Sequence, residues 1–551
     1  MHADEILPLA LQHHQAGRFT EAVDAYHQAL SLSPDRVEIH NNLGSALRSL
    51  GDLEAAVSCY ENALNLNPNS PELHNNLANV LQQLNQLDQA IHHYDSAIFL
   101  DPNFANAHNN LAKAYDDQGQ LDQAIASYRR ALTLDPNSPR IHSNLIYALH
   151  FHPDSTQESL YEEHGRWNNI HAAPLKKLQH PHKNDPTPNR PLRIGYVSPD
   201  FRQHPVGRFL RPLLSAHDRE KFHIYCYASQ VNHDELTTRL ASHADVWRNV
   251  YDLNDDQLAN QIRADEIDIL VDLTMHMAGN RLLVFARKPA PIQITYLAYC
   301  STTGLDAIDY RLTTRHLDPP TENESIYSEQ SIHLKTYWCY SPAIDTPAVN
   351  ELPALCKGHI TFGCLNNFCK VTQPTLQTWA QILNAVQNSR LLLYCPTGTP
   401  RDRVRHFFES HTIAPHRLNF ADFAHLPQYF EQYNQIDIAL DPFPYTGGTT
   451  TCDALWMGVP VISLTGPTAI SRSGLEILTT VGLPELAVET VEQYIHNAMK
   501  WATHLAKLRE LRTSLRPQMQ NSPLTDAAQF SRAIESAYRT IWQTWCRCQT
   551  L

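Results

Sequence analysis

The sequence predicts an α-helical superhelix followed by two α/β lobes, each built on a parallel sheet. Three observations lead to this fold class: an internal repeat in the first part of the chain, a Pro-rich break that follows it, and short apolar segments alternating with amphipathic ones beyond about residue 190. Such alternation is typical of parallel strands with helices on both faces of the sheet. The 551 residues are enough for two or three compact units.

The repeat has a period of 34 residues, which is that of the helix–turn–helix unit of tetratricopeptide repeats (TPR). Four phases hold one residue type in every unit, namely Pro34, Pro68, Pro102 and Pro136; Ala22, Ala56, Ala90 and Ala124; Tyr26, Tyr60, Tyr94 and Tyr128; and Ala29, Ala63, Ala97 and Ala131. Small residues let paired helices approach closely, and proline opens the next unit. We therefore expect a TPR α-superhelix of about four repeats over residues 1–150.

A polar phase of the repeat consists of Asn42, Asn76, Asn110 and Asn144. On the first helix of a TPR unit, this position faces the concave groove. A row of amide side chains there can donate to and accept from an extended peptide backbone, whatever the peptide's side chains are. The pattern therefore predicts that protein acceptors bind through the TPR groove. The alternative is that asparagine is simply a common residue of the repeat at this position.

The remainder of the chain divides into a helical and Pro-rich linker (151–190), a first lobe (191–345) and a second lobe with C-terminal helices (346–551). The expected strands are 192–198, 222–229, 267–274 and 292–299 in the first lobe, and 360–367, 389–395, 417–422, 436–443 and 461–466 in the second. Two such lobes bind a ligand in the crevice at the carboxyl ends of their strands.

The segment IDIALDPFPYTGGTTTCDALWMG carries the most chemical information. A strand is expected to end at Asp441, two glycines at 447–448 form a loop, and three threonines at 449–451 lead into a helix. The threonine hydroxyls and the first helical N–H groups then form an anion-binding site at a helix N-terminus. Asp453, in the first turn, is placed to accept from sugar hydroxyls. A plain threonine cap after a tight turn is the alternative interpretation.

Other candidate groups follow neighbouring strands. Asn366, Asn367 and Lys370 come directly after the expected strand 360–367, where a lysine predicts pairing with a phosphate. In the first lobe, His204 lies between a strand and a helix, where it can act as a base, a substrate-positioning residue or a helix cap. A further group in that lobe, Asp272, Thr274 and His276, lies at or beyond the end of another strand.

Composition and missing motifs exclude several classes of protein. The net charge of −14 argues against nucleic acid or an anionic membrane as partner, and no apolar run of about 18 residues predicts a membrane span. The eleven scattered cysteines indicate reduced thiols, and with no recognisable signal peptide we expect a cytoplasmic protein. There is no P-loop or dinucleotide fingerprint, so neither of these phosphate-binding sites fits. Because there is also no Asp-x-Asp loop, we expect a metal-free site rather than a metal-bound nucleotide-sugar site, and no cofactor.

Five segments resemble the O-linked N-acetylglucosamine transferase family, in particular its SPINDLY-like bacterial and plant branch. They are RIGYVSPDFRQHPV, DILVDLTMHMAGNRL, RKPAPIQITYLAYCSTTGLDAIDYRLT, TFGCLNNFCKVT and ALDPFPYTGGTTTCDALWMGVPVISL, in the family's order behind TPR units. The resemblance implies a two-lobed GT-B fold. It also implies an inverting glycosyltransferase that works without a metal ion and moves a sugar from a nucleotide to Ser or Thr of a protein.

The resemblance also implies roles for individual residues. They are diphosphate binding by Lys370, Thr449 and Thr450 with Asn367 beside them, ribose binding by Asp453, base-pocket positions at Ala424 and Tyr429, and a catalytic or acceptor-site histidine at His204. Together with Gly448 these residues make up the expected nucleotide-sugar site, and Lys370 and His204 are the expected catalytic residues.

Several positions depart from the family pattern. Gly448, Tyr429 and Arg263 stand where the animal enzymes have histidines, Met275 replaces a frequent glycine, and Ala-Tyr-Cys at 298–300 replaces Gly-Tyr-Pro. These departures leave the donor open between UDP-N-acetylglucosamine, which the animal relatives use, and GDP-fucose, which plant SPINDLY proteins use. A TPR scaffold with weak or lost catalysis is a further alternative.

Overall fold

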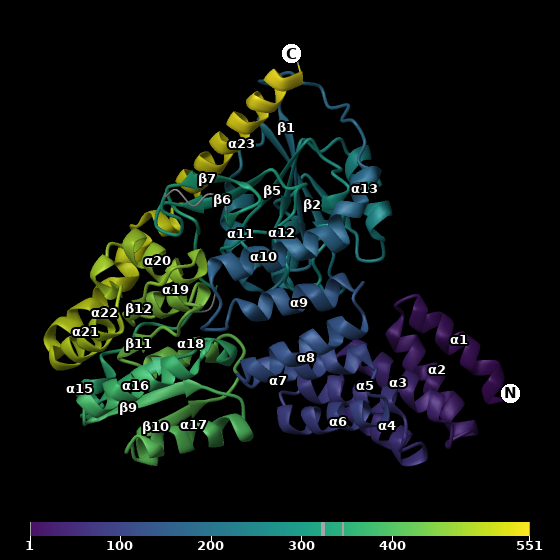
Figure 1. The fold of residues 1–551 in the computed structure, drawn as a ribbon, viewed down its shortest axis with the longest axis horizontal. Helices are drawn as coiled ribbons and strands as arrows, with labels where there is room; N and C mark the ends of the chain where they lie inside the picture. The colour runs from purple at the N-terminus through teal and green to yellow at the C-terminus, as the bar shows by residue number, and fades with distance from the viewer. Residues whose placement is uncertain (1, 321–325, 344–345, 550–551) are drawn as a thin grey trace. The chain divides into compact units, whose positions relative to one another are not determined.

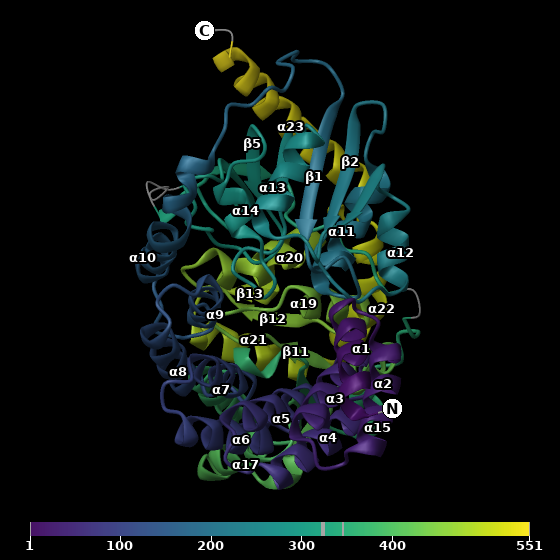
Figure 2. The same cartoon turned by 90° about the vertical axis from the view of Figure 1, so that its right-hand side faces the viewer.

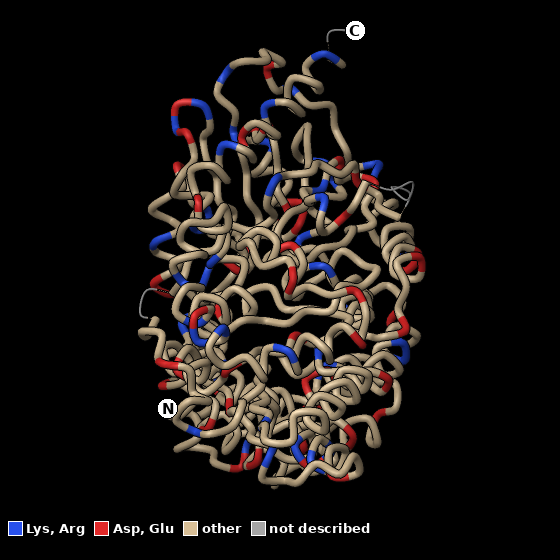
Figure 3. Tube along the Cα trace, turned by 90° about the vertical axis from the view of Figure 1, so that its left-hand side faces the viewer, with Lys and Arg blue, Asp and Glu red and all other residues tan. Residues whose placement is uncertain are grey.

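The computed structural model describes residues 2–320, 326–343 and 346–549. The chain forms two compact units, Met1–Ile141 with Cys395–His406, and His142–Tyr394 with Phe407–Leu551. Lysines and arginines are interspersed with aspartates and glutamates along the trace (Figure 3). None of the described helices combines the length and hydropathy that crossing a membrane requires.

The first unit is a series of antiparallel helix pairs, which confirms the predicted TPR superhelix (Figure 1). Its helices are α1 (Ala3–Gln15), α2 (Phe19–Leu32), α3 (Val37–Leu50), α4 (Leu53–Leu66), α5 (Pro71–Gln83), α6 (Leu87–Leu100), α7 (Ala105–Asp117) and α8 (Leu121–Leu134). The repeated alanines and tyrosines are all buried. The paired helices α3 and α4 pack closely at Gly44, where a Cβ atom would lie 3.0 Å from the Tyr60 ring.

A short segment from much later in the chain also belongs to the first unit. The backbone N–H of Thr399, the first residue of α17 (Thr399–Ser410), donates to the Asp88 carboxylate of α6 at 2.9 Å. Gly398 has a φ of +81°, and a Cβ atom there would collide with the same carboxylate. Glycine is therefore required both for the backbone conformation and for the close approach.

The boundary between the units falls inside α9 (Pro139–Leu149), although we expected the superhelix to continue to residue 150. Ile146 of α9 shares an apolar core with Trp167 and Leu282 of the second unit. The linker then forms α10 (Gln157–Trp167), a π-helical turn (Asn168–Ala172) and a 3₁₀ turn (Ala173–Leu178). Burial of these apolar side chains makes most of α9 part of the second unit.

The first lobe of the second unit contains a seven-stranded parallel sheet of order β3-β2-β1-β4-β5-β6-β7. Its strands are β1 (Leu192–Ser198), β2 (Phe222–Ala228), β3 (Val246–Asn249), β4 (Ile269–Asp272), β5 (Ile292–Thr295), β6 (Tyr310–Thr314) and β7 (Gln330–Leu334), and its helices are α11 (Pro205–Ala216), α12 (Glu235–Ala241), α13 (Asp255–Ala264) and α14 (Leu282–Ala286). β1, β2, β4 and β5 fall in the expected segments. β3, β6 and β7, in which polar side chains interrupt the apolar ones, were not predicted.

The second lobe contains a six-stranded parallel sheet of order β10-β9-β8-β11-β12-β13, which confirms the two-lobe fold class. Its strands are β8 (Ile360–Cys364), β9 (Ser389–Tyr394), β10 (Leu418–Ala421), β11 (Ile438–Leu440), β12 (Val461–Leu464) and β13 (Ala487–Val488). The further helices are α15 (Pro353–Lys357), α16 (Gln373–Ala385), α18 (Gln428–Gln432), α19 (Thr449–Trp456), α20 (Ser473–Val481), α21 (Val491–Thr503) and α22 (Leu505–Gln520). Only the two-residue β13 lies outside the expected strands.

The C-terminal helix α23 (Ala527–Gln549) follows the second lobe in sequence but packs on the first (Figures 1 and 2). Its Glu535 carboxylate accepts from the backbone N–H of Asp218 at 2.8 Å and lies 2.9 Å from His217 Nδ1. Tyr538 and Tyr196 of β1 are joined by their hydroxyls, 3.3 Å apart. The helix therefore ties the two lobes together through buried polar contacts.

Each sheet has one place where the strand order reverses beside its first strand, between β1 and β4 in the first lobe and between β8 and β11 in the second. At such a switch point the connections leave in opposite directions and open a crevice at the carboxyl ends of the strands. The loops that follow these four strands carry most of the candidate groups predicted for the two lobes, whereas Ala424 and Tyr429 follow β10.

Candidate active site

The loops after β8 and β11 meet at the second-lobe switch point. Asn366, two residues beyond β8, accepts a hydrogen bond from the Thr450 hydroxyl at 2.6 Å. Asp441, directly beyond β11, accepts from the Gly447 N–H at 3.1 Å and from the Ser463 hydroxyl at 2.9 Å. The structure thus connects the two segments that the sequence had offered as separate candidates.

The Asp441 carboxylate is fully buried beneath the glycine loop. Burial raises its pKa to about 6, against the opposing effect of the hydrogen bonds that it accepts from Ser463 and Gly447. A Cβ atom on Gly447 would lie 2.6 Å from Asp441 Oδ1 and 2.3 Å from Thr451 Oγ1. Only glycine therefore lets the loop close over this carboxylate.

Lys370 lies in a 3₁₀ turn (Phe368–Lys370) that follows β8. Its ammonium donates to the Thr446 carbonyl at 3.1 Å and lies 3.9 Å from the centre of the Tyr445 ring. Burial lowers the pKa of Lys370 from its ordinary value, against the attraction of nearby groups that include Asp441. A half-buried cation held mainly by a carbonyl and an aromatic face can still gain a charge-assisted bond to an anion.

The N-terminus of α19 adds backbone donors to the lysine. The N–H groups of Thr449, Thr450 and Thr451 find no acceptor among the described residues, and the first N–H bonded within the helix region is that of Cys452, to the Gly448 carbonyl at 3.1 Å. Unpaired N–H groups at a helix N-terminus, together with the helix dipole, attract an anion. Lys370 and the start of α19 therefore form an anion cradle.

Asp453, one turn further along α19, is buried and pairs with the first lobe. Arg208 of α11 donates to it through both terminal nitrogens, at 2.6 and 3.1 Å, and the hydroxyls of Tyr340 and Tyr429 donate at 2.7 and 3.3 Å. Burial alone lowers the pKa of Arg208, but the ion pair with Asp453 outweighs it and leaves that pKa raised. The sequence had not indicated Arg208 or Tyr340.

The other predicted donor residues lie around this centre. Asn367 is exposed at the start of the 3₁₀ turn, and Ala424 is half-buried in the loop before α18. Tyr429 of α18 bonds to both Tyr433 and Asp453. Gly448 has a φ of −116°, and the nearest atom to a Cβ there would be in Trp338, at 3.9 Å. Local packing therefore leaves open space at Gly448.

His204 caps α11. Its Nδ1 accepts from the Val206 N–H at 3.3 Å and lies 3.6 Å from the Asp200 carboxylate. Burial lowers the pKa of His204 against the effect of Asp200, so the neutral ring with its proton on Nε2 fits this arrangement. His204 is therefore a helix cap, one of the three roles that the sequence left open for it. His204 and Arg208 are one turn apart on α11.

The other first-lobe candidates have structural contacts. Asp272 accepts from the N–H groups of Thr274 and Met275, at 3.1 and 2.9 Å. His276 is buried, with Nδ1 3.0 Å from the Ser143 hydroxyl and Nε2 2.8 Å from the Thr303 carbonyl. Met275 has a φ of +48°, a region that glycine adopts without strain.

The remaining departures from the family pattern fall in two places. Arg263 of α13 donates to the Arg287 carbonyl at 2.8 Å, so it helps to pack the first lobe. Ala298 and Met275 lie with the retained Tyr299 in an apolar cluster that also includes Tyr445 and Ile470 of the second lobe, and the neighbouring Cys300 is buried. Since Tyr445 contacts Lys370, these first-lobe departures lie next to the anion cradle.

Three of the four ladder asparagines lie on the first helices of pairs in the first unit. Asn76 Nδ2 donates to Asn41 Oδ1 at 3.0 Å, and Asn110 Nδ2 donates to Asn75 and Asn79, both at 3.0 Å. Asn42 accepts from its neighbour Asn41 at 3.4 Å. The row is therefore held by bonds between repeats, which occupy part of the capacity predicted for a peptide. Asn144 lies on α9, in the second unit.

In the described part of the chain, no group of three or more His, Cys, Asp or Glu side chains is arranged to hold a metal ion. The positive charge of the anion cradle comes from the Lys370 ammonium and from the N–H groups at the N-terminus of α19.

Comparison with known proteins fits this geometry. The family model described as glycosyl transferase family 41 matches residues 137–340 and 346–534, which include both lobes and every loop of the cradle. The chain belongs to glycosyl transferase family 41. TPR models match residues 10–47, 44–85 and 75–139 of the same chain. The resemblance noted in the sequence is thereby confirmed.

Relatives in family 41 include plant and bacterial proteins. The chain is 37% identical over 410 residues, 73% of its length, to "Probable UDP-N-acetylglucosamine--peptide N-acetylglucosaminyltransferase SPINDLY" of Solanum lycopersicum. It is 31% identical over 371 residues, 65% of its length, to "Probable UDP-N-acetylglucosamine--peptide N-acetylglucosaminyltransferase SEC" of Arabidopsis thaliana. These matches cover 44% and 38% of the two plant proteins, so the chain spans less than half of their length.

A solved structure matches nearly the whole family 41 chain. A mutant of the Thermobaculum terrenum O-GlcNAc transferase superposes with a TM-score of 0.88 and 34% sequence identity, covering 93% of this chain and 98% of that one. The order of TPR helices followed by two parallel-sheet lobes is therefore shared with a solved protein.

Proposed function

We propose that this family 41 protein transfers N-acetylglucosamine from UDP-N-acetylglucosamine to Ser or Thr side chains of proteins, with inversion and without a metal ion. The observation that carries the proposal is the cradle of Lys370 and the α19 N-terminus at the switch point. The names of the plant relatives and of the Thermobaculum protein support this donor.

The proposed reaction is a direct displacement. The acceptor hydroxyl oxygen bonds to the anomeric carbon as the bond from that carbon to the diphosphate breaks, so negative charge grows on the phosphate oxygens. The hydroxyl proton passes to an oxygen of the leaving diphosphate. Groups that are already in place and aimed at developing charge lower the barrier most. Lys370 and the N–H groups of 449–451 supply this stabilisation, with the Thr449 and Thr450 hydroxyls beside them.

The acceptor side of the proposal uses the first lobe and the TPR unit. His204, with its proton on Nε2, donates to an acceptor oxygen and so orients the acceptor rather than deprotonating it. The free amide positions of Asn42 and Asn76 bind the acceptor's backbone. Asn367 lies beside Lys370 at the diphosphate, Ala424 and Tyr429 contact the base, and the open space at Gly448 faces the sugar.

A labelled-donor experiment tests the proposal. The protein is incubated with a cell lysate and either UDP-N-acetylglucosamine or GDP-fucose carrying a label on the sugar, and protein-bound label is followed after base treatment and after a peptide-N-glycosidase. We expect label only from UDP-N-acetylglucosamine, on Ser or Thr, and unchanged when a chelator is added. Label from GDP-fucose alone would replace the donor, and no protein-bound label from either would contradict the proposal.

A further inference from the structure

The Asp453 carboxylate has no acceptor position left for a ligand in this structure. Oδ1 accepts from Arg208 Nη2 and the Tyr340 hydroxyl, and Oδ2 from Arg208 Nη1 and the Tyr429 hydroxyl, at distances from 2.6 to 3.3 Å. An ionised carboxylate offers about four lone-pair positions in all. A ribose hydroxyl can therefore bond to Asp453 only when one of these donors leaves.

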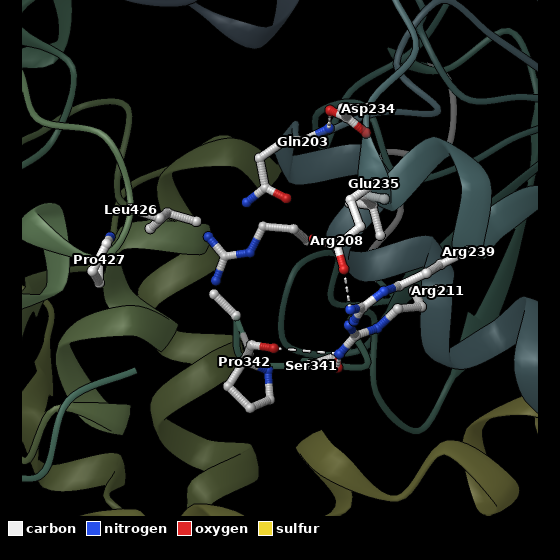
Figure 4. Close-up of a pocket in the computed structure, with 12 residues that line it drawn as sticks. Gln203, Arg208, Arg211, Asp234, Glu235, Arg239, Ser341, Pro342, Leu426 and Pro427 are labelled. Atoms are coloured by element: carbon white, nitrogen blue, oxygen red, sulfur yellow. Dashed lines mark hydrogen bonds and ion pairs between the residues drawn. The ribbon is translucent and has the colours of Figure 1, made fainter. Parts of the chain in front are cut away.

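Of these donors, Arg208 is the one with a cavity beside its side chain. It lines a cavity of about 290 Å³ between α11, α12, residues 341–343 and the loop before α18. Figure 4 shows its side chain between Leu426 and Pro427 of the second lobe and the helix that carries Arg239. Gln203 and Glu235 line the same cavity, together with Arg211 and Arg239. Oε1 of Glu235 already accepts from Arg239, so the Gln203 amide oxygen and Oε2 of Glu235 are the acceptors on offer. Tyr340 and Tyr429, in contrast, are rings packed among other aromatic side chains.

The present position of Arg208 also leaves one of its own donors unused. Its Nε is buried and has no hydrogen-bond partner among the described residues. A buried unpaired donor is unfavourable, so the ion pair does not satisfy the whole guanidinium. A second position in the cavity, with acceptors from Gln203 and Glu235, would compensate part of the loss of Asp453.

We propose that Arg208 is a gate on the donor site: the ribose hydroxyls of a nucleoside diphosphate displace its guanidinium from Asp453, and the guanidinium moves into the adjoining cavity. This inference rests on the proposed function, which places a nucleoside diphosphate along α19. The order of groups agrees with it, because Asp453 lies one helical turn beyond Thr449 of the cradle, as a ribose lies beyond a diphosphate. Arg208 thereby selects for ligands whose ribose can compete with an ion pair.

A gate and a direct ligand contact predict opposite effects of removing the arginine. If Arg208 competes with the ribose, its loss leaves Asp453 to the two tyrosines and strengthens nucleotide binding. If Arg208 itself binds the diphosphate, its loss weakens nucleotide binding. The observed affinity of the protein equals the affinity of its binding-competent state multiplied by the fraction of molecules in that state.

Calorimetric titration with UDP and with GDP tests the gate on the full chain. The variants are Arg208→Met, Tyr340→Phe as a milder release of Asp453, and Arg190→Met as a control. Arg190 forms a similar two-pronged ion pair with Asp268 in the first lobe, at 2.6 and 2.7 Å. We expect Arg208→Met to lower Kd about tenfold, which corresponds to a gate that is open in about one molecule in ten. Tyr340→Phe should lower Kd by a smaller factor, and the Arg190→Met control should leave Kd unchanged.

The outcomes separate the gate from the proposed function. Unchanged or weaker binding by both Arg208→Met and Tyr340→Phe, with wild-type binding intact, overturns the gate and leaves the proposed function standing. Absence of UDP and GDP binding by the wild-type protein overturns the proposed function. If circular dichroism shows that Arg208→Met does not fold, the Kd of Tyr340→Phe decides: a lower Kd supports the gate, and an unchanged or higher Kd overturns it.

Discussion

Arg208 and Asp453, 245 residues apart in the chain, form a buried ion pair that joins the first lobe to the second. The side chains are 12% and 1% exposed, so neither is well solvated. Removing one partner of such a pair leaves a buried charge and costs about 3–5 kcal/mol, whereas removing both costs much less. A double-mutant cycle therefore measures how strongly the two side chains interact.

We expect Arg208→Met and Asp453→Asn each to lower the free energy of unfolding of the second unit by several times the loss that a surface ion pair would give. The double variant should lose less than the sum of the two single losses. Denaturant titration followed by tryptophan fluorescence measures these values. Strictly additive losses would mean that the two side chains do not interact in solution.

Lys370 is the side chain on which the proposed chemistry depends most. Lys370→Met keeps the length of the side chain but removes the cation, so we expect transfer to fall by at least about 10²–10³-fold, the usual loss for a group that stabilises developing charge. The exposed Lys357→Met is the control and should keep wild-type transfer. Single-turnover assays with labelled donor measure both, and thermal unfolding checks that each variant is folded.

The two loop glycines should respond differently to a methyl group. A Cβ atom on Gly447 collides with Thr451 and Asp441, whereas one on Gly448 meets nothing closer than 3.9 Å. We expect Gly447→Ala to lower Tm by several degrees, because the strain is of the order of 1–3 kcal/mol, and Gly448→Ala to leave it within error. Equal Tm values for the two variants would show that the loop adapts freely.

A buried histidine should make the protein sensitive to acid. His150 packs against Tyr299 and His164, and both of its ring nitrogens lack hydrogen-bond partners among the described residues. Burial holds the pKa of His150 well below its ordinary value of 6.5. The unfolded chain therefore binds more protons than the folded one just below pH 6.5, and stability falls as the pH drops through that range.

We expect His150→Phe to reduce the loss of Tm between about pH 7.5 and about pH 5, because each unit of pKa depression accounts for about 1.4 kcal/mol. The variant should also be more stable than wild type at neutral pH, since an unpaired polar group leaves the core. His223→Gln, an exposed substitution, serves as the control. An unchanged pH dependence in His150→Phe would place the acid sensitivity elsewhere.

The ladder asparagines should separate stability from acceptor binding. Asn110 uses both amide hydrogens within the TPR unit, so Asn110→Ala should lower the unfolding free energy by about 1 kcal/mol per lost bond. Asn42 only accepts from Asn41, and its amide hydrogens remain available to a peptide. Asn42→Ala should therefore raise KM for a protein acceptor with little change in Tm. Unchanged KM in Asn42→Ala and Asn76→Ala would argue against peptide binding along this row.

Local patterns in the sequence were enough to predict the architecture. The 34-residue phase of alanine and tyrosine follows from helix packing, and the apolar strands of both lobes follow from burial on both faces of a parallel sheet. β3, β6 and β7 were missed because polar side chains interrupt their apolar residues, and β13 because it has only two residues. The anchoring of α17 by Asp88 and the return of α23 to the first lobe were also missed, since neither leaves a local pattern.

The candidate site divides in the same way. Gly447, Lys370 and the threonines of α19 could be found from residue type and spacing, because a glycine loop before a helix attracts anions through backbone geometry alone. The role of His204 as a cap and the engagement of Asp453 could not. Tyr340 lies in the aromatic-rich segment Tyr337–Trp338–Cys339–Tyr340, which is a sequence signal for a buried aromatic cluster, whereas nothing in the sequence points to Arg208.

The sequence by itself determined the TPR repeat, the two parallel sheets, the switch points and the residue types that face them. Only the tertiary structure decided that Asp453 is already paired and that Arg208 is its partner. The physical reason is that repeats, strands and caps arise from interactions between near neighbours in the chain. A buried ion pair between lobes depends on which side chains the folded sheets bring within about 3 Å of each other.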